Sequence, residues 1–347
     1  MDSWARQSLV PLSGLMNPGM LARLTGQRCI FPFYHVVSDQ DLPHIKNLYA
    51  YPDEKQFEAD LEALLKRFTP ISIQDYLDEQ ENGGGKKKRK PGMVLSFDDG
   101  LSQCHSFIAP LLKQKGVPAM FFLNNDFIDN RGLFYRYKAS ALLEHLRKNS
   151  SLLSQAADYL AIPENQVYTA IMMINSRQLP LLDGLALHVE MDDALYMRDY
   201  PVYMSSEQVR HLMNLGFHVG AHGSDHLEFQ RMEEKHMEAE AAISMKGIVE
   251  EFACSPALFA FPFSSDGVPE KVVRALLREG GIDVLFGTAG LKIAGNPHFI
   301  QRIPMEVSPS PRALFRHKRN YSVREVLGAE FLYYMAKGVV GRNHYQY

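Results

Sequence analysis

The sequence predicts an α/β fold with a mainly parallel sheet. Short apolar runs that resemble buried strands alternate along the 347 residues with longer stretches of helical periodicity, and this alternation is typical of parallel α/β proteins. Two of the apolar runs end directly at polar motifs, Asp98-Asp99-Gly100 and 222–226. Because the loops after the carboxyl ends of parallel strands carry the chemistry in such folds, we expect both motifs to serve one site.

Length and composition are those of a globular protein. The chain is 46% apolar and 22% charged, which suffices for a core in one large domain or two ordinary ones. Its net charge of −3 argues against nucleic-acid binding as the main function, because such surfaces are basic. Cys29, Cys104 and Cys254 lack CxxC spacing and are expected to be reduced, packed thiols.

The elements predicted for the first part alternate in type. The apolar run 30–34 indicates a first strand, and 93–97 and 119–123 indicate two more. Helices are expected at 54–68, where apolar residues form one stripe, and at 102–115. Between them, the glycines and the basic run of 81–90 predict a solvated loop, with a localisation signal or a contact for an anionic polymer or lipid as the alternative.

The next predicted strand, 217–221, follows only after about 90 residues, far more than an ordinary crossover needs. Helical patterns lie at 137–148, 151–161 and 164–176, whereas 129–135 and 181–201 look irregular. We interpret 130–200 as an inserted helical subdomain on the rim where the site opens. It could act as a lid, or it could only cover an exposed face or make an oligomer contact.

The last part returns to the alternating pattern. Ser205 and Gln208 have the spacing of a capping box, which predicts a helix start. Further helices are expected at 233–252 and 269–280, followed by a strand at 283–287. The last forty residues are expected to form a helix packed against the fold.

The two polar motifs together suit a catalytic metal site. Adjacent carboxylates at 98 and 99 can divide the work of metal ligand and general base, and histidines four residues apart can project to one side of a helical turn and bind one ion. Aspartate with two histidines leaves coordination positions open for water and substrate. Each motif alone is weak, since the first is common in solvated turns and the second occurs on surface helices by accident.

At these residues the sequence resembles a known family. Residues 95–100 resemble the first motif of the NodB-homology polysaccharide deacetylases (carbohydrate esterase family 4), and 222–226 resemble the second, with Gly223 where Ser or Thr is common. Residues 259–263 resemble the third motif in its aromatic-Pro-aromatic form, and 34–37 resemble the first strand of many relatives. The order and spacing match over roughly residues 30 to 307.

The resemblance implies a deformed (β/α) barrel, often with seven parallel strands. The expected division of the chain is an N-terminal extension (1–29), a barrel (30–129 and 201–307), the helical insertion (130–200) and a C-terminal helical segment (308–347). The implied reaction is hydrolysis of an N-acetyl group, or less often an O-acetyl ester, on an amino-sugar-containing glycan or glycan precursor. Such an enzyme is a hydrolase acting on carbon–nitrogen bonds other than peptide bonds.

The resemblance also assigns roles to residues. One divalent ion, with zinc as the default and cobalt, nickel or iron as alternatives, would be bound by Asp99, His222 and His226. Asp98 would be the general base, and the backbone N–H of Phe263 an oxyanion donor.

Two departures from the family pattern concern the remaining roles. The third motif often has an arginine that pairs with the base, and Ala260 occupies that place, which leaves the orientation of Asp98 to other groups. His298 is the nearest candidate for the general acid, although the expected Leu-x-x-x-His pattern is absent and an exposed loop histidine is the alternative. His35 and Pro262 are expected to contact substrate.

Two other functions stay open at this point. A binding protein of the same fold that has lost turnover would explain the missing arginine and the unassigned acid. A non-haem iron oxygenase also uses two histidines and one carboxylate, but that class usually has a β-sandwich pattern. No secretory signal and no membrane span is visible, so a cytoplasmic location follows by default, with envelope association as the alternative. The sequence does not indicate the oligomeric state.

Overall fold

The computed structural model describes residues 9, 13, 17–82, 90–292, 295–306 and 321–337. Its larger sheet has eight strands in the order β10-β9-β8-β7-β6-β5-β2-β11, and every neighbouring pair is parallel. The strands are β2 (Pro32–Tyr34), β5 (Leu95–Phe97), β6 (Ala119–Leu123), β7 (His218–Ala221), β8 (Leu258–Ala260), β9 (Val284–Gly287), β10 (Phe299–Gln301) and β11 (Ile303–Pro304).

The sheet closes into a barrel at Arg302. β10 pairs with β9 and β11 pairs with β2, at opposite ends of the strand order, yet only Arg302 separates β10 from β11. The Arg302 N–H donates to the carbonyl of Gly287 on β9, and the next N–H, of Ile303, donates to Phe31 beside β2. If β10 and β11 are counted as one interrupted strand, the eight strands become seven. The expected deformed barrel is therefore confirmed.

A second, three-stranded sheet extends the amino ends of two barrel strands. Its order is β1-β4-β3, with β1 (Cys29–Ile30), β4 (Gly92–Met93) and β3 (Thr69–Pro70). β1 precedes β2 and β4 precedes β5 with one residue between them, so each predicted strand, 30–34 and 93–97, is found as two short pieces.

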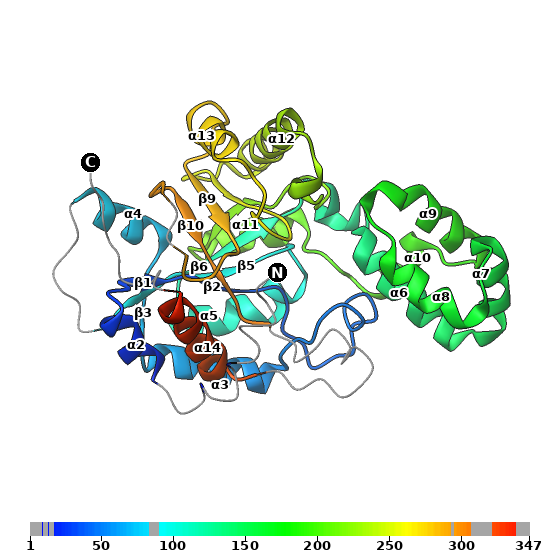
Figure 1. Cartoon of the computed structure of the whole chain (residues 1–347), viewed down its shortest axis with the longest axis horizontal. Helices are drawn as coiled ribbons and strands as arrows, with labels where there is room; N and C mark the ends of the chain where they lie inside the picture. The colour runs from blue at the N-terminus through cyan, green and yellow to red at the C-terminus, as the bar shows by residue number, and fades with distance from the viewer. Residues whose placement is uncertain are drawn as a thin grey trace.

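Helices surround the barrel (Figure 1). They are α2 (Pro18–Leu24), α3 (Glu54–Leu65), α4 (Ile73–Glu81), α5 (Ala109–Gln114), α11 (Ser206–Asn214), α12 (Glu234–Phe252), α13 (Glu270–Arg278) and α14 (Val323–Ala336). The predicted capping box is present, because the Ser205 side chain accepts from the N–H of Gln208 and the Gln208 side chain accepts from the N–H of Ser205. The helix expected at 102–115 is divided into a π-helical turn, Cys104–Ile108, and α5.

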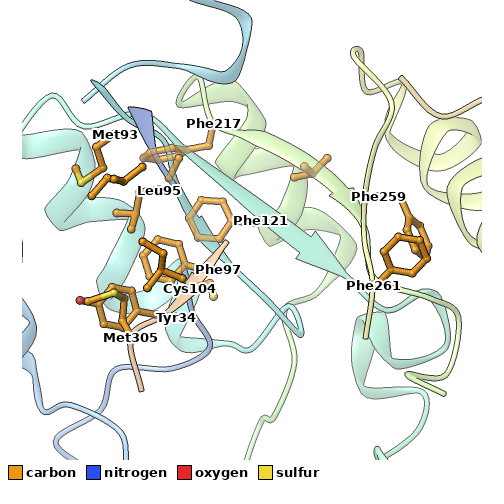
Figure 2. Close-up of a cluster of buried hydrophobic side chains, with 14 of the residues drawn as sticks. Tyr34, Met93, Leu95, Phe97, Cys104, Phe121, Phe217, Phe259, Phe261 and Met305 are labelled. Carbon is orange, nitrogen blue, oxygen red and sulfur yellow. The ribbon is translucent and has the colours of Figure 1, made fainter. Parts of the chain in front are cut away.

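Side chains of each strand alternate between two buried clusters. Phe97 and Phe121 lie side by side (Figure 2), and their rings stack with centroids 5.2 Å apart. They belong to a cluster that also includes residues of the helices α3, α5 and α12. Met120 and Phe122 belong to the second cluster, which is drawn mainly from strand residues. This alternation follows from the two-residue repeat of a strand and identifies the second cluster as the barrel interior.

The insertion is mostly helical and lies at one side of the barrel (green in Figure 1). Its helices are α6 (Tyr135–Lys148), α7 (Leu153–Leu160), α8 (Glu164–Met173), α9 (Leu179–His188) and α10 (Asp193–Asp199). The three predicted helices are confirmed, but the expectation that 181–201 is irregular is wrong. Pro180 occupies the first turn of α9, and the Asp192 side chain caps α10 by accepting from two backbone N–H groups.

Parts of the predicted termini and the basic loop lie outside the described residues. These are most of 1–16, positions 83–89 of the predicted loop, and 307–320 and 338–347. Within the C-terminal segment, α14 buries Leu327 and Phe331 in the cluster shared with the helices. All three cysteines are buried, and they form no disulfide with one another. None of the helices in the described part of the chain combines the length and apolar character needed to cross a membrane.

Candidate metal centre and active site

The predicted motifs meet at the carboxyl ends of neighbouring strands. Asp98 and Asp99 follow β5, His222 follows β7, and Phe263 lies three residues beyond β8. Because β5, β6, β7 and β8 are adjacent in the sheet, the loops after them lie at one rim of the barrel. The order of the strands in the sheet therefore brings motifs that are distant in the sequence together in one site.

Asp99, His222 and His226 form a buried cluster whose ligand atoms all lie within 4.8 Å of one another. Oδ1 of Asp99 is 3.4 Å from Nε2 of His222 and 3.2 Å from Nε2 of His226. Nδ1 of His222 is 2.8 Å from the carbonyl oxygen of Ala260, to which it can donate, and that tautomer leaves Nε2 as an acceptor.

The donor set suits a divalent ion. Among the described residues, Oδ1 of Asp99 has no hydrogen-bond donor although it is buried, and a buried carboxylate oxygen without a partner is costly. Burial lowers the pKa of His226 in spite of the nearby Asp99 charge, which favours the neutral imidazole that a metal ligand requires. A carboxylate oxygen beside two imidazole nitrogens matches the ligand preferences of zinc and its neighbours.

The loop 222–226 is not helical, so the expectation of two histidines on one helical turn is wrong. The histidines converge because the backbone turns through left-handed conformations, with φ of +79° at Gly223 and +58° at His226. Asp99 and Phe263 also have positive φ, at +70° and +56°. Non-glycine residues held in this region store strain and concentrate at functional sites.

Asp98 is held by Arg302, which the sequence analysis did not identify. The guanidinium forms a forked ion pair, with Nη1 2.6 Å from Oδ1 and Nη2 2.8 Å from Oδ2. Arg302 is fully buried and lies over the rings of Phe33 and Phe122, at 4.4 and 5.0 Å from their centroids. Burial raises the pKa of Asp98, but the charge of Arg302 and its hydrogen bonds oppose this, and the pKa lies below its usual value. Arg302 thus supplies the cation that is missing at Ala260.

His35 pairs with Glu306, a second residue that the sequence analysis missed. One Glu306 oxygen accepts from the N–H groups of His35 and Val36, at 2.9 and 3.0 Å, and the other contacts Nδ1 of His35. Burial lowers the pKa of His35, but the Glu306 charge and hydrogen bond dominate and raise it to about 10. Asp99 and Asp98 also favour the charged ring. His35 is therefore an imidazolium at neutral pH, and it interacts electrostatically with both carboxylates.

His298 is not brought to this site. It precedes β10, and its Nδ1 lies 3.0 Å from the carbonyl oxygen of Asp283, which precedes β9. The side chain is exposed at the amino ends of these strands, whereas the metal cluster lies at carboxyl ends. This geometry corrects the expectation that His298 is the general acid.

Phe263 and Pro262 lie beside the cluster. The Phe263 ring is 37% exposed and its centroid is 4.7 Å from that of His226. A Cβ at Gly223 would lie 3.2 Å from Cγ of Pro262, so the proline packs directly against the histidine loop. The oxyanion role of the Phe263 N–H and the substrate contact of Pro262 remain predictions.

Tyr137 reaches the cluster from α6 of the insertion. Its hydroxyl donates to Oδ2 of Asp99, the oxygen that does not face the histidines. Burial and then the Asp99 charge raise the pKa of Tyr137 well above its usual value, which keeps the hydroxyl protonated. No local sequence pattern marks this residue, whereas Arg302 could have been noticed as the one charged residue in 299–304.

Comparisons with known proteins bear on the family and the fold of this chain. The family model described as "Polysaccharide deacetylase" matches residues 85–285, more than half of the chain. The structure of IcaB from Ammonifex degensii is similar, with a TM-score of 0.50 and 15% identity over 87% of this chain and 97% of that one. The Streptococcus pyogenes deacetylase PplD, solved in complex with acetate, has a TM-score of 0.51 and 11% identity over 84% and 98%.

At these identities the likeness to solved structures shows the fold alone, and no curated protein matches the chain. The family model covers β5 to β8 and the start of β9, a span that includes the aspartate and histidine motifs. On the strength of that match, the chain belongs to the polysaccharide deacetylase family.

Proposed function

We propose that the protein is a metal-dependent hydrolase that removes N-acetyl, or less often O-acetyl, groups from an amino-sugar-containing glycan and releases acetate. One observation carries the proposal: a buried Asp99, His222 and His226 cluster lies beside a second carboxylate, Asp98, that is separately held by an arginine. Two adjacent carboxylates in different surroundings can take different roles, one as ligand and one as base.

Asp99, His222 and His226 would hold the ion, with zinc as the default. A bound divalent ion would lower the pKa of a water molecule and polarise the acetyl carbonyl. The buried positions of all three side chains exclude bulk water, which strengthens electrostatic interactions in the site.

Asp98 is the proposed proton acceptor. Both of its oxygens are engaged by Arg302, which fixes the plane of the carboxylate and keeps it ionised. An ionised, oriented carboxylate can take the proton of an attacking water. The N–H of Phe263 would stabilise the oxyanion that develops on the acetyl group.

His35 replaces His298 as the proposed proton donor to the leaving amine. Its Nδ1 is engaged by Glu306, so the second ring proton resides on Nε2. The raised pKa keeps the ring charged through neutral pH. Glu306 is thereby a positioning residue that fixes the tautomer and orientation of the donor.

The two alternatives lose their support. The binding-protein hypothesis rested on a missing arginine and an unassigned acid, and Arg302 and His35 are available for these roles. The oxygenase class usually has a β-sandwich, whereas the sheet of this chain is a parallel barrel.

The test is acetate release from a panel of N- and O-acetylated amino sugars and their oligomers. Chelator-treated protein should be inactive and should regain activity with zinc, cobalt, nickel or iron, whereas His226→Ala should lose most of its metal and stay inactive. The panel would also distinguish amide from ester hydrolysis. Metal binding without acetate release from any substrate would favour the binding-protein alternative, and a wild-type protein that binds no ion would overturn the proposal.

A further inference from the structure

The helical insertion contributes a side chain to the proposed metal centre. Tyr137, on α6, is 1% exposed and donates its hydroxyl hydrogen to Oδ2 of Asp99. The other oxygen, Oδ1, faces Nε2 of His222 and of His226. The two oxygens of the carboxylate thus have different partners, one the Tyr137 hydroxyl and the other the two histidines.

The Tyr137 hydroxyl is itself held in place. The hydroxyl of Tyr49 lies 3.2 Å away and can donate to it, since Tyr137 uses its own hydrogen for Asp99. The Tyr137 ring meets Phe134 and His44 edge-on, with centroids 5.1 and 5.7 Å apart. A hydroxyl fixed by packing and by a second hydrogen bond can orient a carboxylate with little loss of entropy.

A second contact ties the insertion to the histidine loop. Glu228, two residues beyond His226, is buried and accepts hydrogen bonds from the hydroxyls of Tyr135, at 2.7 Å, and Ser176. Tyr135 is on α6, and Ser176 lies between α8 and α9. The insertion therefore contacts both loops that carry the proposed ligands.

We propose that Tyr137 is a positioning residue for the metal ligand Asp99, and that the insertion is a fixed part of the metal centre rather than a detachable cover. This inference rests on the proposed function, because it concerns the ion that Asp99, His222 and His226 would hold. Partners that hydrogen-bond to a ligand fix its orientation and raise metal affinity. Tyr137 performs this role for Asp99 from outside the barrel.

The experiment compares Tyr137→Phe with a matched control, Tyr203→Phe. Tyr203 is also buried, and its ring centroid lies 6.4 Å from that of Tyr137, but its hydroxyl accepts from the N–H of Phe134 rather than bonding to a ligand. Zinc and cobalt affinities of chelator-treated proteins would be measured by competition with a chromophoric chelator. We expect Tyr137→Phe to weaken binding by about 10- to 100-fold and Tyr203→Phe by no more than about 3-fold.

Each outcome decides a separate question. The positioning role is overturned if the wild type binds metal and Tyr137→Phe binds it with the same affinity. It is also overturned if Tyr137→Phe and Tyr203→Phe lose the same amount of metal affinity. In both cases the proposed function stands. If the wild type binds no metal, the proposed function itself falls, and the inference with it. Should Tyr137→Phe fail to fold, Tyr49→Phe replaces it, because it removes the hydrogen bond that holds the Tyr137 hydroxyl. A several-fold loss of affinity is then expected, and an unchanged affinity overturns the inference.

Discussion

Arg302 forms an ion pair with both oxygens of Asp98, and it is also the residue at which the barrel closes. Its side chain makes the 2.6 and 2.8 Å contacts of the forked ion pair, while its backbone separates the strand that pairs with β9 from the strand that pairs with β2. Barrel closure and orientation of the proposed base therefore depend on one residue. Changes at Arg302 should affect both folding and catalysis, in proportions set by the replacement.

Arg302→Lys keeps the charge but loses the fork. A lysine ammonium cannot hold both oxygens in one plane, so the Asp98 carboxylate should turn, and small misplacements of a reacting group cost about 100-fold in rate. We expect kcat for acetate release to fall by about that factor while metal content is unchanged.

Arg302→Met is the control for the charge itself. It leaves Asp98 buried without its cation, which should lower the free energy of unfolding by about 3–5 kcal/mol. Urea unfolding measures this loss. Full activity in Arg302→Lys would show that the fork does not orient the base.

The residues that sequence reasoning identified are those that lie in short motifs after strands. Asp98 and Asp99 are adjacent, and His222 and His226 are four positions apart, so each pair is visible locally. Arg302 is 204 positions from Asp98, and Tyr137 is 38 from Asp99. Their contacts depend on barrel closure and on the docking of α6, and no local pattern records either event.

The closing strand also explains why the sequence pointed to His298. Residues that serve a parallel barrel's site follow the strands, and His298 precedes β10 whereas Glu306 follows β11. The strand was not recognised because Gln301 and Arg302 interrupt its apolar pattern. Arg302 is tolerated there because Asp98 neutralises its charge inside the barrel.

Substitutions of the two neighbouring aspartates should affect metal binding and rate differently. Asp98→Asn keeps the size of the side chain but cannot accept a proton, so it should retain metal and lose rate by about two to four orders of magnitude. Asp99→Asn removes the anionic ligand, so metal affinity should fall first and activity with it. Metal content and acetate release would be measured on both variants, with and without excess zinc.

Excess metal should partly rescue Asp99→Asn and should not rescue Asp98→Asn. If Asp98→Asn loses the ion and Asp99→Asn keeps it, the two roles are exchanged. Full activity in both variants would make the motif a structural turn and remove the basis of the proposed function.

The His35–Glu306 pair should leave a signature in the pH dependence of stability. The pKa of His35 rises from 6.5 to about 10 in the folded protein, so the folded state binds a proton that the unfolded state releases between these values. The stabilisation is fully present below pH 6.5 and is lost as pH rises through about 10. The difference in urea midpoint between wild type and His35→Gln should therefore shrink across this window.

The same variant tests the proposed proton donor, with His298→Ala as its matched control. A glutamine side chain cannot deliver a proton, so His35→Gln should lower kcat by about two to four orders of magnitude while retaining metal. His298→Ala removes an exposed side chain at the other end of the strands and should leave both kcat and metal content unchanged. In the stability experiment, a difference in urea midpoint between wild type and His35→Gln that stayed constant from pH 6.5 to about 10 would contradict the His35–Glu306 ion pair. A rate loss in His298→Ala with full activity in His35→Gln would return the general-acid role to His298 and exclude His35.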